Sequence, residues 1–336
     1  MRFGFMHDSP WGVSEDDFPR AGSPRERLRF LLGYAVLAAS SHNTQPWRFA
    51  VEDESAVAVY ADADGWLRVA DAGQRELHIS AGCALENLLV AAEHFGYGHA
   101  VEYLPDPATP SLVARVRFEP AGSPSPFRPT ELFEAVTRRR TSRRVFAPEP
   151  VAAHALARVA ACRVEEGLEL LLTDDAELKA ALEGLVRRAD AVEFADPAFR
   201  RELGEWVGRG VFGTPWPLSK VAGFAVARVN AGARVGERDC ELLRSAPVLG
   251  LICSRDDSRV THLKVGQLFE RVHLTATAHG LSLQPMSQLV QVAEVREELA
   301  RLWPARGLVP QQPFRLGYAE PERGHTPRRP SSELLN

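Results

Sequence analysis

The chain has 336 residues, which is long for one hydrophobic core and short for three, so we expect one large domain or two closely packed ones. The formal net charge of −4 and the sequence pI near 6.2 give no general attraction to nucleic acid or to a membrane surface. We therefore expect a small-molecule substrate as partner, with no nucleic acid and no membrane. No signal-peptide core and no apolar run of the ~18 residues of a spanning helix is present, and the four cysteines form no C-x-x-C pair. These features predict a cytoplasmic protein with unpaired thiols.

The first part of the chain is predicted to contain a polar arm at 1–24 and a half-chain unit at 25–120. Ser23-Pro24-Arg25-Glu26 has the pattern of an N-cap followed by proline and glutamate in the first turn, which predicts a helix from 25 to about 39. Two strands, a long helix ended by Gly96 and two more strands are expected next, at 47–51, 56–60, 75–95, 101–104 and 112–118. Residues 121–129 have the proline- and glycine-rich composition of a linker.

The second part, 130–336, is predicted to alternate helices and strands. Helices are expected at 130–140, 152–164, 176–192 and 261–279, and strands at 168–173, 246–253 and 314–318. Residues 194–221 contain two tryptophans with glycines and prolines, which predicts a short helix and then an irregular segment of functional-loop length. We interpret this segment as a candidate lid, and the residues from 321 onward as a polar tail.

A dense polar cluster, Ser40-Ser41-His42-Asn43-Thr44-Gln45-Pro46-Trp47-Arg48-Phe49, follows the first predicted helix. Pro46 prevents simple continuation of that helix, and the residues from Arg48 onward alternate as in a strand, so the cluster is expected to be a loop. Such loops carry binding and catalytic residues more often than packing residues.

Five arginines and two hydroxyl residues occupy 138–144. An isolated charge run is usually a solvated surface, but guanidinium forks and hydroxyls are also the donors that a phosphate monoester prefers. A second pair, Arg328-Arg329, could approach the same phosphate. No G-x-G-x-x-G, Walker or H-E-x-x-H motif is present, which disfavours a Rossmann-type nucleotide site.

An internal repeat relates 78–96 to 262–280 without a gap. Both segments begin with histidine and end with glycine, and they align Gly82 with Gly266 and Glu86 with Glu270. Their apolar positions share a 4-3-4 spacing, which gives each helix one buried face. Any two buried helices share such a stripe, but the matched ends favour duplication of a half-chain unit, packed as a pseudo-dimer.

Two other readings of the histidines are weaker. Ser41-His42 would suggest a hydrolase, but sequence neighbours rarely form a nucleophile and base, and no G-x-S-x-G motif is present. His78 and His262 have no second ligand at metal spacing, so capping or core roles are expected and no metal site is predicted.

These motifs make the chain resemble the nitroreductase-like flavoproteins, and within them the Acg-type group of fused, double-length members. The resemblance extends from about 25 to 335 and rests on segments that occur in this order: 39–49, 139–146, 284–288, 307–318 and 326–330. It implies an α+β, nitroreductase-like fold of two related halves in one chain, with FMN bound where the halves meet. The second half has no counterpart of the polar loop and the first half has no full arginine motif, so one complete flavin site is expected in each chain.

The resemblance also assigns roles to residues. It implies that Arg139, Thr141 and Arg143 bind the FMN phosphate, with Arg328 or Arg329 adding charge. It implies that the ribityl chain or the ring edge is contacted by Ser40, Ser41, Asn43 and Gln45. It places along the isoalloxazine the segment Pro285, Met286, Ser287 and Gln288, with a backbone N–H of one of the last two facing N5.

The implied function is an FMN-dependent oxidoreductase that transfers hydride from NAD(P)H through flavin N5 to nitroaromatic or quinone-like acceptors. Because this chemistry belongs to the flavin, no catalytic side chain is predicted. The alternative is an FMN-storing protein with a lidded flavin and little or no turnover. Both a monomer with an internal pseudo-dimer and a homodimer agree with this expectation.

Overall fold

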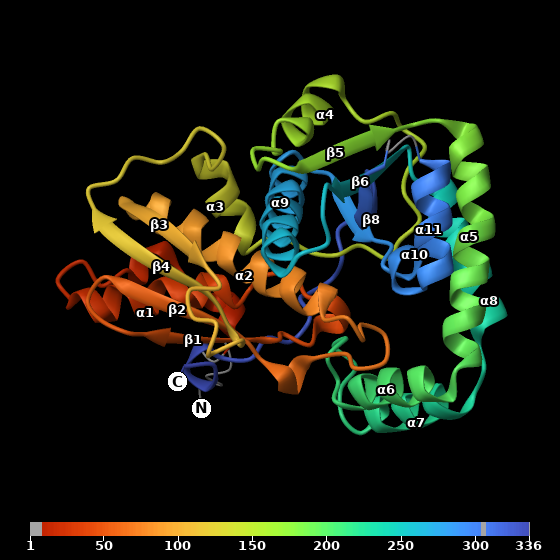
Figure 1. Cartoon of the computed structure of the whole chain (residues 1–336), viewed down its shortest axis with the longest axis horizontal. Helices are drawn as coiled ribbons and strands as arrows, with labels where there is room; N and C mark the ends of the chain where they lie inside the picture. Colours follow the sequence, from red (N-terminus) through yellow and green to blue (C-terminus); the bar gives the residue numbers. More distant parts are fainter. Residues whose placement is uncertain (1–8, 304–306, 336) are drawn as a thin grey trace, which may run out of the picture.

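The computed structural model describes residues 9–303 and 307–335 and contains two four-stranded antiparallel sheets, each with its own helices (Figure 1). This architecture confirms the predicted α+β class with two related halves. Residues 1–8 of the predicted arm lie outside the described residues.

The first sheet has the strand order β1-β2-β4-β3, with β1 (Trp47–Val51), β2 (Ala56–Ala61), β3 (Tyr97–Tyr103) and β4 (Leu112–Pro120). Helix α1 (Pro24–Ala35) begins at the predicted capping box, in which the Glu26 N–H donates to Ser23 Oγ and the Ser23 N–H donates to the Glu26 carboxylate. Helix α2 (Arg75–His94) is buried along almost its whole length.

The second sheet repeats this order as β5-β6-β8-β7, with β5 (Leu168–Thr173), β6 (Val248–Ser254), β7 (Ser282–Pro285) and β8 (Val309–Gly317). Helix α9 (Arg259–Ala278) connects β6 to β7 as α2 connects β2 to β3. The other α-helices of this half are α3 (Thr130–Val136), α4 (Ala153–Ala160), α5 (Ala176–Ala195), α6 (Pro197–Gly208), α7 (Leu218–Arg228), α8 (Gly232–Ser245), α10 (Gln288–Gln291) and α11 (Ala293–Leu302).

The segment 194–221 contains more helix than its sequence predicts. Helix α6 fills most of its first half, and α7 begins inside it; together they form a hairpin at the outer edge of the second half (Figure 1). Pro217 obscures the start of α7 in the sequence, but it stands at the N-cap, where its missing N–H costs no helical hydrogen bond. Within the described ranges, no helix has the length and apolar character needed to cross a membrane.

Helices α2 and α9 cross at the centre of the molecule, between the two sheets (Figure 1). A Cβ on Gly82 would collide with the carbonyl oxygen of Leu263, and a Cβ on Gly266 would collide with that of Ile79. Ile79 and Leu263 are themselves equivalent positions of the repeat, so the contact is symmetric about a pseudo-twofold axis. The predicted pairing of Gly82 with Gly266 therefore has a steric basis, because only glycine lets the two backbones approach this closely.

The other paired residues of the repeat lie beside this crossing. Glu86 is fully buried and accepts hydrogen bonds from Arg128 and Arg271 at 2.8–3.0 Å. Burial alone would raise the pKa of Glu86, but the two guanidinium groups outweigh it and lower the pKa to about 2. Its counterpart Glu270 lies 3.1 Å from Arg139 instead. The repeat thus keeps the buried glutamates but gives them different partners.

The C-terminal tail crosses from the second half to the first. Leu335 forms a parallel bridge with Phe49 on β1, and the Phe49 N–H donates to the carbonyl of Leu334 at 2.8 Å. Leu334 is fully buried in the core of the first half. The tail therefore fixes the two halves together by adding backbone pairing at the free edge of the first sheet.

The helix crossing generates a stability prediction. Gly82→Ala and Gly266→Ala should each destabilise the protein by about 1 to 3 kcal/mol, because the added methyl group forces α2 and α9 apart. Gly184→Ala on α5 is the matched control, since a Cβ there meets nothing within 4 Å. It should stabilise the protein by about 0.5 to 1 kcal/mol through helix propensity. Urea unfolding midpoints of the three variants measure the difference, and equal midpoints at all three positions would contradict the close crossing.

Candidate functional site

The polar loop between α1 and β1 has a strained backbone. His42, Asn43 and Gln45 have positive φ angles of 49°, 56° and 53°, although none of them is glycine. A left-handed conformation at such residues is uncommon and costs on the order of 1 kcal/mol each. Three within four residues indicate that the surrounding contacts hold the loop in place.

Hydrogen bonds inside the loop and to α2 supply part of that support. Ser40 Oγ accepts from the Gln45 N–H at 3.0 Å, and the Ser41 N–H donates to Ser80 Oγ on α2 at 3.2 Å. Asn43 Nδ2 donates to the carbonyl of Val211, in the loop between α6 and α7, at 2.7 Å. The polar loop is thus tied to α2 and to the candidate lid.

The tail arginines complete this support. Arg328 Nη1 donates to Asn43 Oδ1 at 2.6 Å, and Arg328 Nη2 donates to the carbonyl of Ala38 at 3.1 Å. The Arg329 N–H donates to Gln45 Oε1 at 2.7 Å, while the Arg329 guanidinium lies 3.5 Å from Asp62. Asn43 and Gln45 therefore bind the tail in this structure, and Arg328 uses most of its donors internally.

Arg139, the first of the residues predicted to bind the FMN phosphate, lies between the two halves. Arg139 is 3% exposed, its Nη2 donates to the carbonyl of Leu37 at 2.7 Å, and its Nε lies 3.1 Å from Glu270. The carbonyls of Leu37 and Ala38 thus accept from arginines. Helix α1 ends at Ala35 and not near the predicted residue 39, because the N–H groups of Leu37 and Ala38 bond three residues back, to Tyr34 and Ala35, in tighter turns. A phosphate at Arg139 would have to replace the internal carboxylate of Glu270.

The rest of the arginine motif lies beside β7. Thr141 forms a parallel bridge with Leu283. Ser142 Oγ and the Arg143 N–H both donate to the Glu322 carboxylate, at 3.4 and 3.2 Å. Arg143 itself is exposed. It is therefore the most accessible of the three residues predicted to bind the phosphate, the others being Arg139 and Thr141.

Phe212, from the loop between α6 and α7, lies between the polar loop and the arginine motif. Its ring centroid is 6.3 Å from that of His42 and 4.8 Å from the Arg143 guanidinium carbon. Burial, and then the charge of Arg143, lowers the pKa of His42 to about 4, so its imidazole is neutral at pH 7. In the sequence, His42 suggested only a hydrolase, and no motif distinguishes Phe212 from the other aromatic residues of the irregular segment.

Asp239 on α8 connects Arg143 with the segment predicted to follow the flavin ring. Gln288 Nε2 donates to Asp239 Oδ2 at 2.9 Å. Burial raises the pKa of Asp239, and the charge of Arg143 opposes that rise. In the same segment Met286 is buried and Ser287 is the N-cap of α10, while Pro285 closes β7. No motif in the sequence identifies Asp239.

Two further acids lie near Asp239. Burial, followed by the charge of Asp239, raises the pKa of Asp190 to about 8. Burial, followed by the charge of Asp190, raises the pKa of Glu193 to about 9. Both pKa values lie above 7, so both carboxyl groups are mostly protonated at neutral pH. Among residues 9–303 and 307–335, no group of three or more side chains has the arrangement of a metal site.

A recess of about 510 Å³ opens between the polar loop, the tail and α6. Its lining includes Asn43, Gln45, Arg209, Arg328 and Arg329. Arg328 Nε is buried and has no hydrogen-bond partner among the described residues. The volume lies in the range of small-molecule sites, and the arginines suit an anionic ligand.

The structure thus brings six of the thirteen predicted site residues to two adjoining places. Asn43, Gln45, Arg328 and Arg329 line the recess, whereas Arg143 faces Phe212 on the other side of the α6–α7 loop. Gln288 reaches the same region through Asp239. Arg139 and Thr141 are not part of either surface and support the segment that carries Arg143.

Comparisons with known proteins place these features in context. Rv3131 of Mycobacterium tuberculosis, whose name describes it as a proposed NAD(P)H nitroreductase, is 31% identical over 316 residues, which cover 92% of this chain and 90% of that protein. The protein acg of the same organism, similarly named, is 27% identical over 90% of this chain and 93% of its own length. No protein-family model matches the chain.

Solved structures give weaker matches. The FMN- and NADPH-dependent nitroreductase NfnB from Sphigopyxis sp. strain HMH has a TM-score of 0.41 and 20% identity, over 61% of this chain and 97% of that one. A nitroreductase with bound FMN from Desulfitobacterium hafniense has a TM-score of 0.39 and 15% identity, over 61% of this chain and 97% of its own.

The contacts of Asn43 generate a prediction about the tail. Asn43→Ala removes the acceptor for Arg328 and the donor to the carbonyls of Val211 and Pro327. Each buried partner left without a hydrogen bond should lower the free energy of unfolding by about 1 to 3 kcal/mol. We expect the tail to detach and trypsin to cleave after Arg328 faster than in the unmodified protein. Gln74→Ala is the control, because Gln74 also has a positive φ, 60°, but makes no side-chain cap. Equal cleavage rates in the two variants would show that Asn43 does not hold the tail.

Proposed function

The chain belongs to the family of NAD(P)H nitroreductase-like proteins, and from this premise we propose that it is an FMN-dependent oxidoreductase that carries hydride from NAD(P)H to nitroaromatic or quinone-like acceptors. The observation that supports the proposal most directly is the convergence of two halves on one place. The polar loop of the first half and Arg143 of the second half both contact the loop between α6 and α7, through Val211 and Phe212.

The residues of this region suit an FMN molecule in their chemistry. A phosphate monoester needs guanidinium donors, and Arg143 and Arg329 keep side chains that are at least partly accessible. In the proposal Arg143 binds the phosphate and Arg328 or Arg329 adds charge from the recess, while Arg139 and Thr141 fix the segment that presents Arg143.

The polar loop would hold the remainder of the cofactor. Ser40, Ser41, Asn43 and Gln45 offer hydroxyl and amide groups to the ribityl chain or the ring edge. Pro285, Met286, Ser287 and Gln288 would lie along the ring. Because Asn43 and Gln45 also bind the tail, flavin binding and tail docking would draw on the same side chains.

When bound, FMN would supply the hydride chemistry at its N5 atom. The chain's own contribution is to bind, orient and shield it. His42 is neutral, so its ring adds no positive charge beside Arg143, and its Nδ1 is buried without a hydrogen-bond partner among the described residues. Arg143 offers a positive charge to an anionic ligand, with the carboxyl groups of Asp239 and Glu322 as its charged neighbours.

A second candidate function is storage of FMN with little or no turnover. It is favoured by the same loop between α6 and α7, since Phe212 stands between the polar loop and Arg143 and would restrict access of a second substrate. The two functions differ in whether a nicotinamide can reach the flavin, and not in how the flavin is held.

Spectroscopy separates the two functions. The purified protein should be yellow with an FMN spectrum, or become so when FMN is added. Under anaerobic conditions NADPH or NADH should bleach the flavin rapidly in an oxidoreductase, whereas a storage protein would stay yellow for the same period. A colourless protein that takes up no added FMN would refute both.

The phosphate assignment has its own test. Arg143→Ala and Arg329→Ala should each weaken FMN binding about tenfold to a hundredfold, as expected for loss of a charge-assisted hydrogen bond. The measurement is the FMN dissociation constant from flavin fluorescence, which requires no turnover. Arg163→Ala is the control, since Arg163 forms only an exposed ion pair with Glu169 at 3.6 Å. Unchanged FMN binding in both site variants would refute the assignment.

A further inference from the structure

Helix α7 presents large apolar side chains to solvent. Trp216, Leu218, Val221, Phe224 and Val229 are each between 57% and 77% exposed. They make up five of the ten exposed large apolar side chains in the described part of the chain, yet they fall within 14 residues. Leu218, Val221 and Phe224 follow one another at intervals of three, which places them on one side of the helix.

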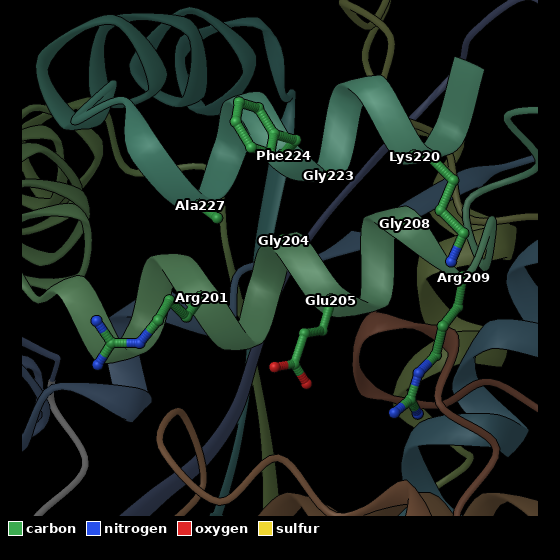
Figure 2. A pocket seen from close by; sticks show the side chains of 9 residues that line it. All are labelled: Arg201, Gly204, Glu205, Gly208, Arg209, Lys220, Gly223, Phe224 and Ala227. Atoms are coloured by element: carbon green, nitrogen blue, oxygen red, sulfur yellow. The ribbon is translucent and has the colours of Figure 1, made fainter. Parts of the chain in front are cut away.

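The opposite side of α7 packs on α6 through small residues. A Cβ on Gly204 would lie 2.6 Å from the Gly223 carbonyl oxygen, and the buried Ser219 lies on the same side as Gly223. Figure 2 shows the two helices in this close contact, with Phe224 directed away from α6. The usual arrangement of a surface helix is thus reversed, since its small residues face the protein and its large apolar residues face outward.

The hairpin is attached through α6, which leaves α7 outermost. The Glu202 carboxylate on α6 accepts from the backbone N–H groups of Val69 and Ala70 at 3.0–3.2 Å. In Figure 1 α7 lies beyond α6 at the edge of the molecule. The apolar face is therefore free to meet a large, flat partner.

The charge of this segment departs from that of the whole chain. The 31 residues from Trp206 to Gly236 contain no Asp or Glu, whereas the full chain has 44 of them and a net charge of −4. The cations in this stretch are Arg209, Lys220, Arg228 and Arg234. The Arg228 guanidinium lies 4.1 Å from the centroid of the Phe224 ring, so positive charge borders the apolar face directly. A surface that combines apolar groups with cations alone is complementary to an anionic lipid surface.

We propose that α7 and the preceding Trp216 form a docking face for an anionic membrane surface, with the apolar side chains inserted at the level of the headgroups. Helix α7 has 11 residues, too few to cross a bilayer, so it would lie in the plane of the interface. Trp216 is the type of side chain that favours this depth, because its ring is apolar and its indole N–H can remain hydrated. The proposal depends on the surface of the hairpin and does not require that the chain bind FMN.

The test is vesicle binding by the full chain. We expect sedimentation with vesicles of phosphatidylcholine and phosphatidylglycerol, much weaker sedimentation with phosphatidylcholine alone, and loss of binding at high salt. Phe224→Asp should reduce the bound fraction, and Lys220→Glu with Arg228→Glu should weaken binding about tenfold or more. Val192→Asp on α5 is the matched control, since Val192 is also an exposed apolar residue, and it should bind like the unmodified protein.

Trp216 provides a second readout that does not depend on sedimentation. Its fluorescence should shift to shorter wavelength when anionic vesicles are added, and Trp216→Phe should remove that shift. Failure of the unmodified protein to bind anionic vesicles would overturn the proposal, as would equal loss in Val192→Asp. A dimer in light scattering that Phe224→Asp converts to a monomer, without vesicle binding, would show that a second copy of the chain covers this face instead.

Discussion

The close approach of α2 to α9 at Gly82 and Gly266 is the constraint on which the rest of the structure depends. It brings the two sheets to either side of one helix pair and places the end of α1 beside the segment that follows α3. The carbonyl of Leu37 and the guanidinium of Arg139 meet there at 2.7 Å, although 102 positions separate them in the chain. A bulkier residue at either glycine would move the polar loop away from the arginine motif.

The C-terminal tail adds a second connection between the halves, and it ends at the candidate site. Leu334 and Leu335 extend the first sheet at β1, while Arg328 and Arg329 bind the strained polar loop. The positive φ angles of that loop are thus stabilised by a segment almost 300 residues later. The conformation of the loop and the docking of the tail therefore depend on one set of contacts.

Much of the fold could be predicted because it is encoded locally. Three such patterns lie within short stretches of sequence: the capping box at Ser23, the row of apolar residues along one face of α2, and the glycines that follow α2 and α9. The FMN site residues and the domain boundaries stay predictions. The end of α1, helix α7 and the roles of Phe212 and Asp239 were not predicted, because each depends on contacts with distant segments. Arg139 shows the limit most plainly, since no spacing in the sequence reveals that Glu270 lies 3.1 Å away.

The α6–α7 hairpin has two faces with different chemistry. Its inner loop contacts the candidate site, where the Val211 carbonyl accepts from Asn43 and Phe212 packs near His42 and Arg143. Its outer helix exposes apolar and cationic side chains. Gly204 and Gly223 allow α6 and α7 to pack closely against each other. Because Phe212 lies in the loop that joins these two helices, the aromatic ring near the candidate site and the exposed apolar face belong to one packed unit.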